Sequence, residues 1–101
     1  MNEAEKIEIV KNKRMRGQVL RTLTLFFPSP VDVSGLKSGL IARGMLISAD
    51  VTKTLYYLKD KDYIRISENK VTEIADDDLV ELTAKGVDLI EGTITDLGVD
   101  I

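Results

Sequence analysis

The amino-acid sequence predicts a single domain of the α+β class, and three observations support this prediction. The chain has 101 residues, of which 44% are hydrophobic, so it can build one domain with a core of its own. Apolar residues recur at helical spacing in four segments, whereas they alternate as in a strand between Tyr63 and Ser67. We divide the chain into an N-terminal arm or early helix (1–15), a domain (16–95) and a C-terminal tail (96–101).

The first helix is predicted from an apolar stripe that begins after Gln18. Its members are Val19, Leu20, Leu23, Phe26 and Phe27. Pro28 ends the helix because proline cannot donate the helical hydrogen bond. Residues 1–15 are polar, with a few loosely spaced apolar side chains. They are expected either to begin this helix near Ala4 or to form an arm that orders on binding.

A very short strand and a second helix are predicted next. Val31 and Val33 alternate with Asp32, which is typical of a strand. The Ser34 hydroxyl can accept an orphan backbone N–H, so this residue is expected to cap a helix from position 35 to about 43. The inward-facing residues of that helix would be Leu36, Leu40 and Ile41.

The third helix follows Gly44, which can take the left-handed conformation that ends a helix. Ser48 is expected to cap this helix, with Asp50 in its first turn. The residues that would face the core are Val51, Leu55 and Leu58. Tyr57 is expected to pack on the core with its hydroxyl at the rim.

A β-hairpin and a last helix complete the prediction. The alternation at 63–67 predicts one strand, and "VTEIA" at 71–75 is expected to return as its antiparallel partner. "LVELT" at 79–83 would form a further strand or complete the hairpin. In the last helix, at 84–94, Val87, Ile90 and Ile94 would share the inner face, with Leu89 off it. The residues after this helix are expected to be loosely held.

This order of elements defines a winged helix-turn-helix, with a three-helix core, a β-hairpin wing and a C-terminal helix. Four segments also carry a resemblance to known proteins: "RGQVLRTL", "VDVSGLKSGLIARGMLIS", "VTKTLYYLKDKDYI" and "LTAKGVDLIEG". Through them, residues 16–99 resemble small winged-helix proteins of Mu-like phages and prophages. More distantly, they are similar to the MarR and arsenic-repressor superfamily of bacterial regulators.

The resemblance implies binding of double-stranded DNA, usually by a dimer, with the third helix in the major groove. Carried over by position, the groove-facing residues are Ala49, Asp50, Thr52, Lys53 and Tyr56. Those near the phosphates or at the base of the wing are Ser34, Lys37 and Arg65. The chain departs from the family in two respects. It lacks Arg, Gln or Asn early on the third helix, where such residues read base edges, and its wing is acidic.

The charge distribution supports two hypotheses about partners. The net charge is −3, but residues 1–65 carry 12 basic and 7 acidic residues, whereas residues 66–101 carry 2 and 10. The acid-free cluster at the start of the first helix can follow a DNA backbone, although such a cluster is also typical of a solvated helix face. Its members are Lys11, Lys13, Arg14 and Arg16. The acidic wing instead favours a protein-protein interaction adaptor that docks a basic partner.

Self-association is expected through apolar residues near the C-terminus, together with the start of the first helix. These residues are Leu89, Ile94 and Leu97. The alternative is that they complete the core of the protomer. The sequence therefore predicts a possible homodimer.

Several classes of function are disfavoured by composition. The chain has no cysteine and no histidine, no glycine-rich phosphate loop and no G-x-S-x-G motif, so we expect no enzyme, no cofactor and no metal site. The run Asp76, Asp77 and Asp78 is expected to be a solvated turn, since consecutive side chains do not converge on one cation. The apolar runs are too short to span a membrane. We expect a cytoplasmic DNA-binding regulator of phage or bacterial origin.

Overall fold

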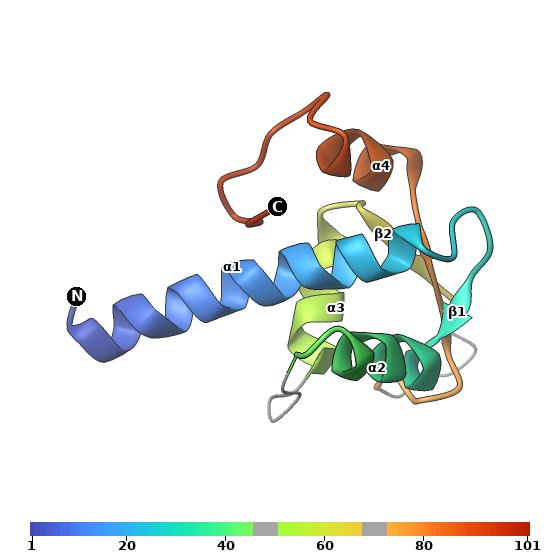
Figure 1. The fold of residues 1–101 in the computed structure, drawn as a ribbon, viewed down its shortest axis with the longest axis horizontal. Helices are drawn as coiled ribbons and strands as arrows, with labels where there is room; N and C mark the ends of the chain where they lie inside the picture. The colour runs from blue at the N-terminus through green and yellow to red at the C-terminus, as the bar shows by residue number, and fades with distance from the viewer. Residues whose placement is uncertain (46–50, 68–72) are drawn as a thin grey trace.

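The computed structural model contains all 101 residues and describes residues 1–45, 51–67 and 73–101. In these ranges the elements follow one another in the order α1-β1-α2-α3-β2-β3-α4 (Figure 1). The three strands form one antiparallel sheet. Helices α1, α2 and α3 each contact one of its strands, and α4 packs on α1. The predicted α+β class is therefore confirmed.

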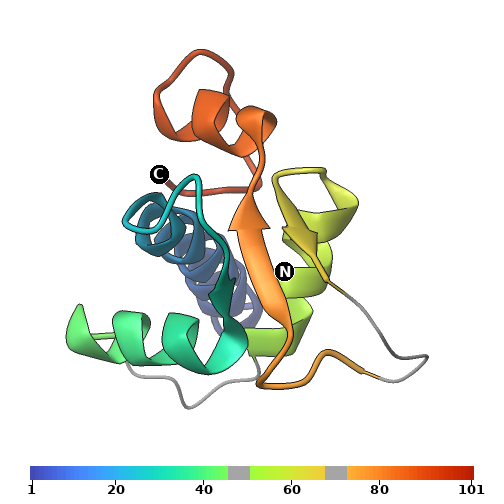
Figure 2. The same ribbon diagram turned by 90° about the vertical axis from the view of Figure 1, so that its right-hand side faces the viewer.

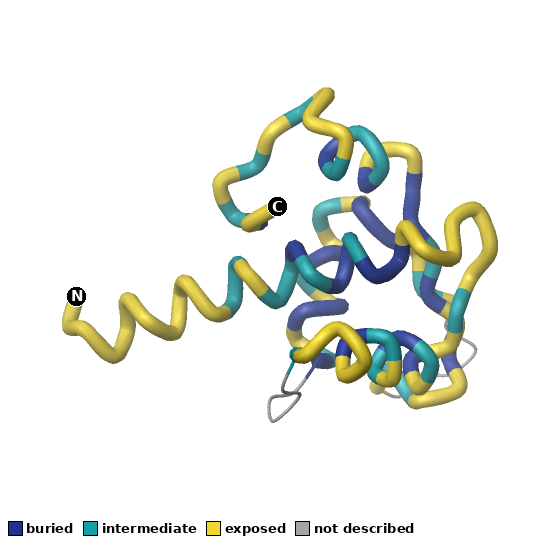
Figure 3. Tube along the Cα trace, viewed as in Figure 1, coloured by how far each residue is buried: buried dark blue, intermediate teal, exposed yellow. Residues whose placement is uncertain are grey.

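Helix α1 (Glu3–Thr24) includes residues 3–15 of the predicted arm. It begins after Asn2, whose side-chain oxygen accepts a hydrogen bond from the Glu5 N–H at 2.8 Å. Carboxylates in the first turn also favour the positive end of the helix dipole. Of the two alternatives for residues 1–15, the early helix is the one observed. Its first turns project beyond the rest of the molecule, and every residue from 1 to 11 is exposed (Figures 1 and 3).

Strand β1 (Val31–Asp32) leads directly into helix α2 (Val33–Ala42). The cap of α2 is Asp32, whose carboxylate accepts the Gly35 N–H at 2.6 Å. Ser34 was predicted to be the cap and instead lies inside the first turn. Asp32 satisfies an orphan N–H of a helix that begins at Val33, so the helix starts two residues earlier than expected.

The earlier start changes which residues of α2 face inward. The buried residues are Val33, Leu36 and Leu40, at i, i+3 and i+7. Ile41 was predicted to face inward but is 61% exposed, because it lies beside this stripe and not on it. Gly44 has a φ of 84°, which confirms the predicted left-handed end of the helix.

Helix α3 (Val51–Asp60) is followed by strand β2 (Ile64–Ile66). The predicted cap Ser48 and the first-turn residue Asp50 lie outside the described residues. The predicted core residues are confirmed: Val51, Leu55 and Leu58 are at most 3% exposed.

Strand β3 (Leu79–Leu82) lies between β1 and β2 and pairs with both (Figure 2). The partner of β2 is thus "LVEL", and the prediction of a returning strand at 71–75 is wrong for its described residues, 73–75. The reason is a turn in which the Asp78 carboxylate accepts the Ala75 N–H at 2.8 Å. The chain becomes extended only after this turn.

Helix α4 (Ala84–Ile90) is capped by the Thr83 hydroxyl, which accepts the Gly86 N–H at 3.1 Å. Leu89 was predicted to lie off the inner face, but it is only 3% exposed and belongs to the core. Gly86 lies close to the Tyr63 carbonyl oxygen, and this contact orients α4 so that the side with Gly86 and Leu89 faces the core. The sequence pattern could not reveal this orientation, since glycine carries no apolar signal.

The C-terminal tail is docked, contrary to the expectation that it is loosely held. Val99 is 5% exposed, and the Asp100 N–H donates to the Lys13 carbonyl oxygen at 3.0 Å. Gly17 of α1 makes this contact possible, because a Cβ there would overlap the carbonyl oxygen of Asp100. The tail is therefore held against the middle of α1 (Figure 1).

Candidate nucleic-acid interface

The side of α3 opposite the core is the centre of the candidate interface. Burial of the aliphatic residues on one side leaves Lys53 exposed and Tyr56 37% exposed on the other. Thr52 is half-buried at the edge, whereas the predicted groove residues Ala49 and Asp50 lie outside the described residues. The predicted packing of Tyr57 on the core is confirmed. An accessible polar strip thus remains on α3, as the helical spacing predicts.

Lys53 already has an anionic neighbour in the protein. Its Nζ lies 3.6 Å from a carboxylate oxygen of Glu8 on α1, and both side chains remain more than half exposed. Sequence reasoning did not foresee this pair, because it requires α1 to continue as a helix alongside α3. The pair neutralises the cation most central to the predicted groove contact.

The predicted phosphate contacts on α2 and the wing are also paired. Lys37 Nζ lies 2.8 Å from the Asp76 carboxylate, and Arg65 Nε donates to the Glu81 carboxylate at 2.9 Å. Arg65 also borders an open hollow of about 270 Å³ on the sheet face. Ser34 is exposed on the first turn of α2. These cations lie at the surface and can exchange partners, because exposed ion pairs contribute only about 0–1 kcal/mol.

The basic cluster of α1 divides into two parts. Lys11 and Arg14 are exposed and make no ion pair within the part of the chain that the structure describes. Lys13 is half-buried. Arg16 lies over the Tyr57 ring, 3.6 Å from its centroid, and donates to the Gly98 carbonyl oxygen at 2.9 Å. Arg16 therefore holds the tail, and the other three are the cations available to an anionic partner.

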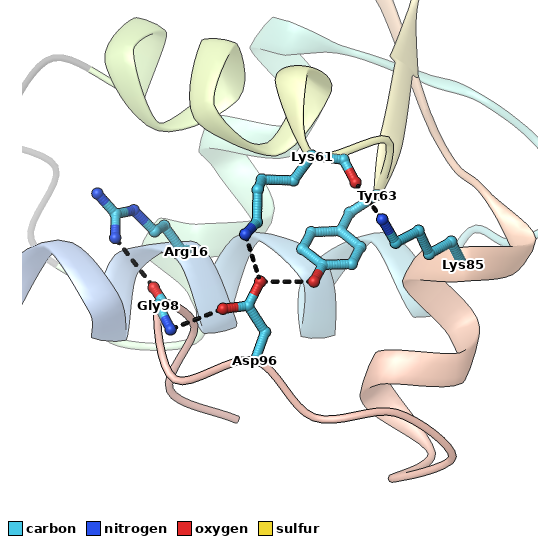
Figure 4. A network of polar contacts seen from close by, with 6 residues as sticks. All are labelled: Arg16, Lys61, Tyr63, Lys85, Asp96 and Gly98. Carbon is cyan, nitrogen blue, oxygen red and sulfur yellow. Dashed lines mark hydrogen bonds and ion pairs between the residues drawn. The ribbon is translucent and has the colours of Figure 1, made fainter.

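A polar network fixes the tail to the rest of the molecule (Figure 4). The Tyr63 hydroxyl donates to the Asp96 carboxylate at 2.5 Å, and Lys61 Nζ lies 3.2 Å from the same oxygen. The other oxygen of Asp96 accepts the Gly98 N–H at 2.7 Å. Sequence reasoning missed this network. The only local signal for it is the D-x-G spacing at 96–98, which is typical of an Asx turn.

The network shifts the pKa values of its two acids in opposite directions. Burial raises the pKa of Tyr63 to about 12, and the hydrogen bond to Asp96 adds to this effect. The pKa of Asp96 is lowered, mainly because its charged form accepts the Tyr63 hydroxyl hydrogen bond. Both shifts favour the neutral phenol paired with the carboxylate, so the network has a structural role.

The remaining predicted residues are placed as follows. Of the expected dimer residues, Leu89 is buried, Ile94 packs on the core of the protomer, and Leu97 is 92% exposed. Asp78 is 8% exposed and forms the turn before β3, whereas Asp76 and Asp77 are exposed. Only the latter two thus fit the expected solvated turn.

No group of three or more acidic residues in the described ranges is arranged to hold a metal ion. Among the helices formed by the described residues, none is both long and apolar enough to cross a membrane.

Comparison with protein families, with curated proteins and with solved structures gave no match to this chain.

Proposed function

We propose that this chain is a winged-helix DNA-binding protein, a transcriptional regulator of phage or bacterial origin that places α3 in the major groove. The observation that carries the proposal is the order of elements around α3. This helix follows α2, buries one side and leaves the other accessible, and is followed by the antiparallel pair β2 and β3. The sheet order β1-β3-β2 fits a hairpin wing beside such a helix. The resemblance of residues 16–99 to winged-helix proteins supports the same proposal.

The dimensions of α3 suit this role. An α-helix with its side chains is about 10–12 Å in diameter, and the major groove is about 12 Å wide, so the 10 residues of α3 can lie in it. Lys53 and Tyr56 would meet the groove or its phosphates. In the bound state a phosphate oxygen would replace Glu8 as the partner of Lys53. Because the Lys53–Glu8 pair is exposed, the loss of this pair costs little.

Lys37 would exchange Asp76 for a phosphate in the same way, and the free cations Lys11 and Arg14 would add sequence-independent contacts. About four phosphate contacts predict a slope of log K against log salt of about −3.6. This value is small for a DNA-binding protein, so binding to random duplex should be weak at physiological salt.

The test is a titration of fluorescent duplex DNA, followed by anisotropy at several salt concentrations. The variant Lys53→Glu, Lys37→Glu replaces two cations, and it should reduce affinity at least about 100-fold and make the salt slope shallower by about 2. Lys85→Glu is the control for one such charge reversal, so it is compared with Lys53→Glu alone. It changes the same charge on α4, at the opposite end of the molecule from α2, and should have little effect (Figure 1).

Equal affinity and equal salt dependence of the double variant and the unaltered protein would remove the assignment of these two lysines. Loss of affinity in the Lys85 control to the same extent as in Lys53→Glu alone would indicate a net-charge effect, and would also contradict a localised interface.

A second candidate function, that of a protein-protein interaction adaptor, is favoured by one specific observation. Three predicted DNA-contacting cations are each within 4 Å of a carboxylate: Lys37, Lys53 and Arg65. Such a surface has little net attraction for phosphate. Asp76 and Asp77, exposed before β3, would then dock a basic segment of another protein.

The two functions predict opposite responses to one change. The variant Asp76→Asn, Asp77→Asn removes negative charge near Lys37, so DNA affinity should rise if α2 and α3 bind DNA. Affinity for a lysine-rich peptide should fall if the adaptor hypothesis holds. Asp78 is left unaltered because its carboxylate forms the turn at Ala75. Peptide binding that persists unchanged would remove the adaptor hypothesis.

A further inference from the structure

The first half of α1 carries a regular stripe that nothing in the described protomer covers. The stripe consists of Glu3, Ile7, Val10 and Arg14, at intervals of four, three and four residues, so it forms one face of the helix. We call this set the α1 stripe. Ile7 is 52% exposed and Val10 is 53% exposed, and both charged members are exposed at its ends.

The α1 stripe points away from the body of the molecule. Glu8 lies on the side of α1 that faces α3, where it pairs with Lys53 at 3.6 Å. By helical spacing, the centre of the stripe lies about 130° around the helix from Glu8. The projecting end of α1 in Figure 1 is therefore accessible to another helix along this face.

The α1 stripe is complementary to itself when one copy is reversed. Consider an antiparallel pair of α1 helices whose two-fold axis passes between positions 8 and 9. Residue n of one copy then lies opposite residue 17 − n of the other copy. Ile7 then meets Val10 of the second copy, and Glu3 meets Arg14 at both ends. In a parallel pair the same stripe would place Glu3 against Glu3 and Arg14 against Arg14, which is unfavourable.

We propose that α1 pairs antiparallel with α1 of a second copy of this chain through the α1 stripe. The pairing buries four aliphatic side chains and forms two ion pairs, with the two globules on opposite sides of the seam. The contact is small compared with a standard protein interface, so the dimer is weak, with a Kd on the order of 100 µM. The proposal does not depend on DNA binding. If both hold, Arg14 contacts the partner copy and Lys11 remains for phosphate.

The first test is sedimentation equilibrium of the full chain up to about 1 mM, without DNA. Glu3→Lys and Arg14→Glu should each weaken association at least tenfold, because each places like charges together at both ends of the seam. The double variant Glu3→Lys, Arg14→Glu should restore association to within about threefold. Glu5→Lys, which makes the same charge change off the stripe, measures any effect on the helix dipole and should leave association unchanged.

The second test fixes orientation, and the chain suits it because it has no native cysteine. An oxidised mixture of Ile7→Cys and Val10→Cys proteins should give mainly the mixed disulfide dimer, whereas a parallel pair would give the two like dimers. The proposal would be overturned if the chain were monomeric at about 1 mM. It would also be overturned if the double charge variant associated no more tightly than the single variants, or if the two like disulfide dimers were preferred.

Discussion

Replacement of Gly17 by alanine should destabilise the protein, although the same change normally stabilises a helix. Gly17 lies in the interior of α1, where alanine is favoured over glycine by about 1 kcal/mol. However, its Cβ would overlap the carbonyl oxygen of Asp100, so either the tail must undock or α1 must move.

The cost of undocking can be worked out from the contacts of the tail. Exposure of Val99 costs about 1.5–3 kcal/mol, and the hydrogen bonds of Arg16 and Asp100 contribute about 0.5–1.5 kcal/mol each. The chain entropy regained by the freed tail offsets much of this loss. With the gain in helix propensity included, we expect a net loss of about 1–2 kcal/mol.

The assay is urea denaturation at pH 7 of four proteins: the full chain and a chain shortened to residue 95, each with and without Gly17→Ala. The substitution should lower the free energy of unfolding of the full chain and raise that of the shortened one by about 0.5–1 kcal/mol. This change of sign is specific to the contact with the tail. Equal stabilisation of both chains would refute the reasoning.

Three further predictions concern the caps and the polar network. Because the pKa of Asp96 is lowered in the fold, its contribution to stability is present above the ordinary carboxyl pKa of 3.8 and is lost as the pH falls below it. Asp96→Asn should therefore make the urea midpoint of unfolding fall less steeply as the pH is lowered through the acid range, and an unchanged fall would contradict this. The pKa of Tyr63 is raised in the fold, so its effect on stability has the opposite pH dependence. Its contribution to stability is complete below about pH 10 and is lost as the pH rises through about 12. Tyr63→Phe should remove this alkaline loss, measured by denaturation at pH 9 and 11.5, and an unchanged alkaline limb would contradict it. Thr83→Ala removes the cap of α4 and should cost about 1–2 kcal/mol by thermal unfolding, compared with less than about 0.5 kcal/mol for the exposed Thr95→Ala.

The elements with strong apolar periodicity were predictable from the sequence. The stripe Val51, Leu55 and Leu58 correctly gave the inner side of α3, and with it the accessible strip that carries Lys53 and Tyr56. These residues are close in sequence, so helical geometry alone determines their relation.

The errors have both distant and local causes. Leu89 is turned inward by the distant approach of Gly86 to the Tyr63 carbonyl. The cap at Asp32, which moves the start of α2, and the turn at Asp78, which decides the partner of β2, are local contacts that the apolar pattern does not reveal. The ion-pair partners of the candidate site residues could not be predicted from the sequence either. The pair Lys53–Glu8 joins residues from two helices, and nothing in the spacing of either helix indicates the other. Local pattern predicted which side of α3 is buried, but not which charges meet across the surface.

The docked tail also sets an order of events in folding. Its partners come from α1, α3 and the turn before β2, and Arg16 and Gly98 are 82 positions apart in the sequence. Such a contact closes almost the whole chain into a loop, so it forms only after the surface that receives it has assembled. The Asp100 amide, bonded to the Lys13 carbonyl, should therefore exchange its hydrogen slowly only in molecules whose helices are already in place.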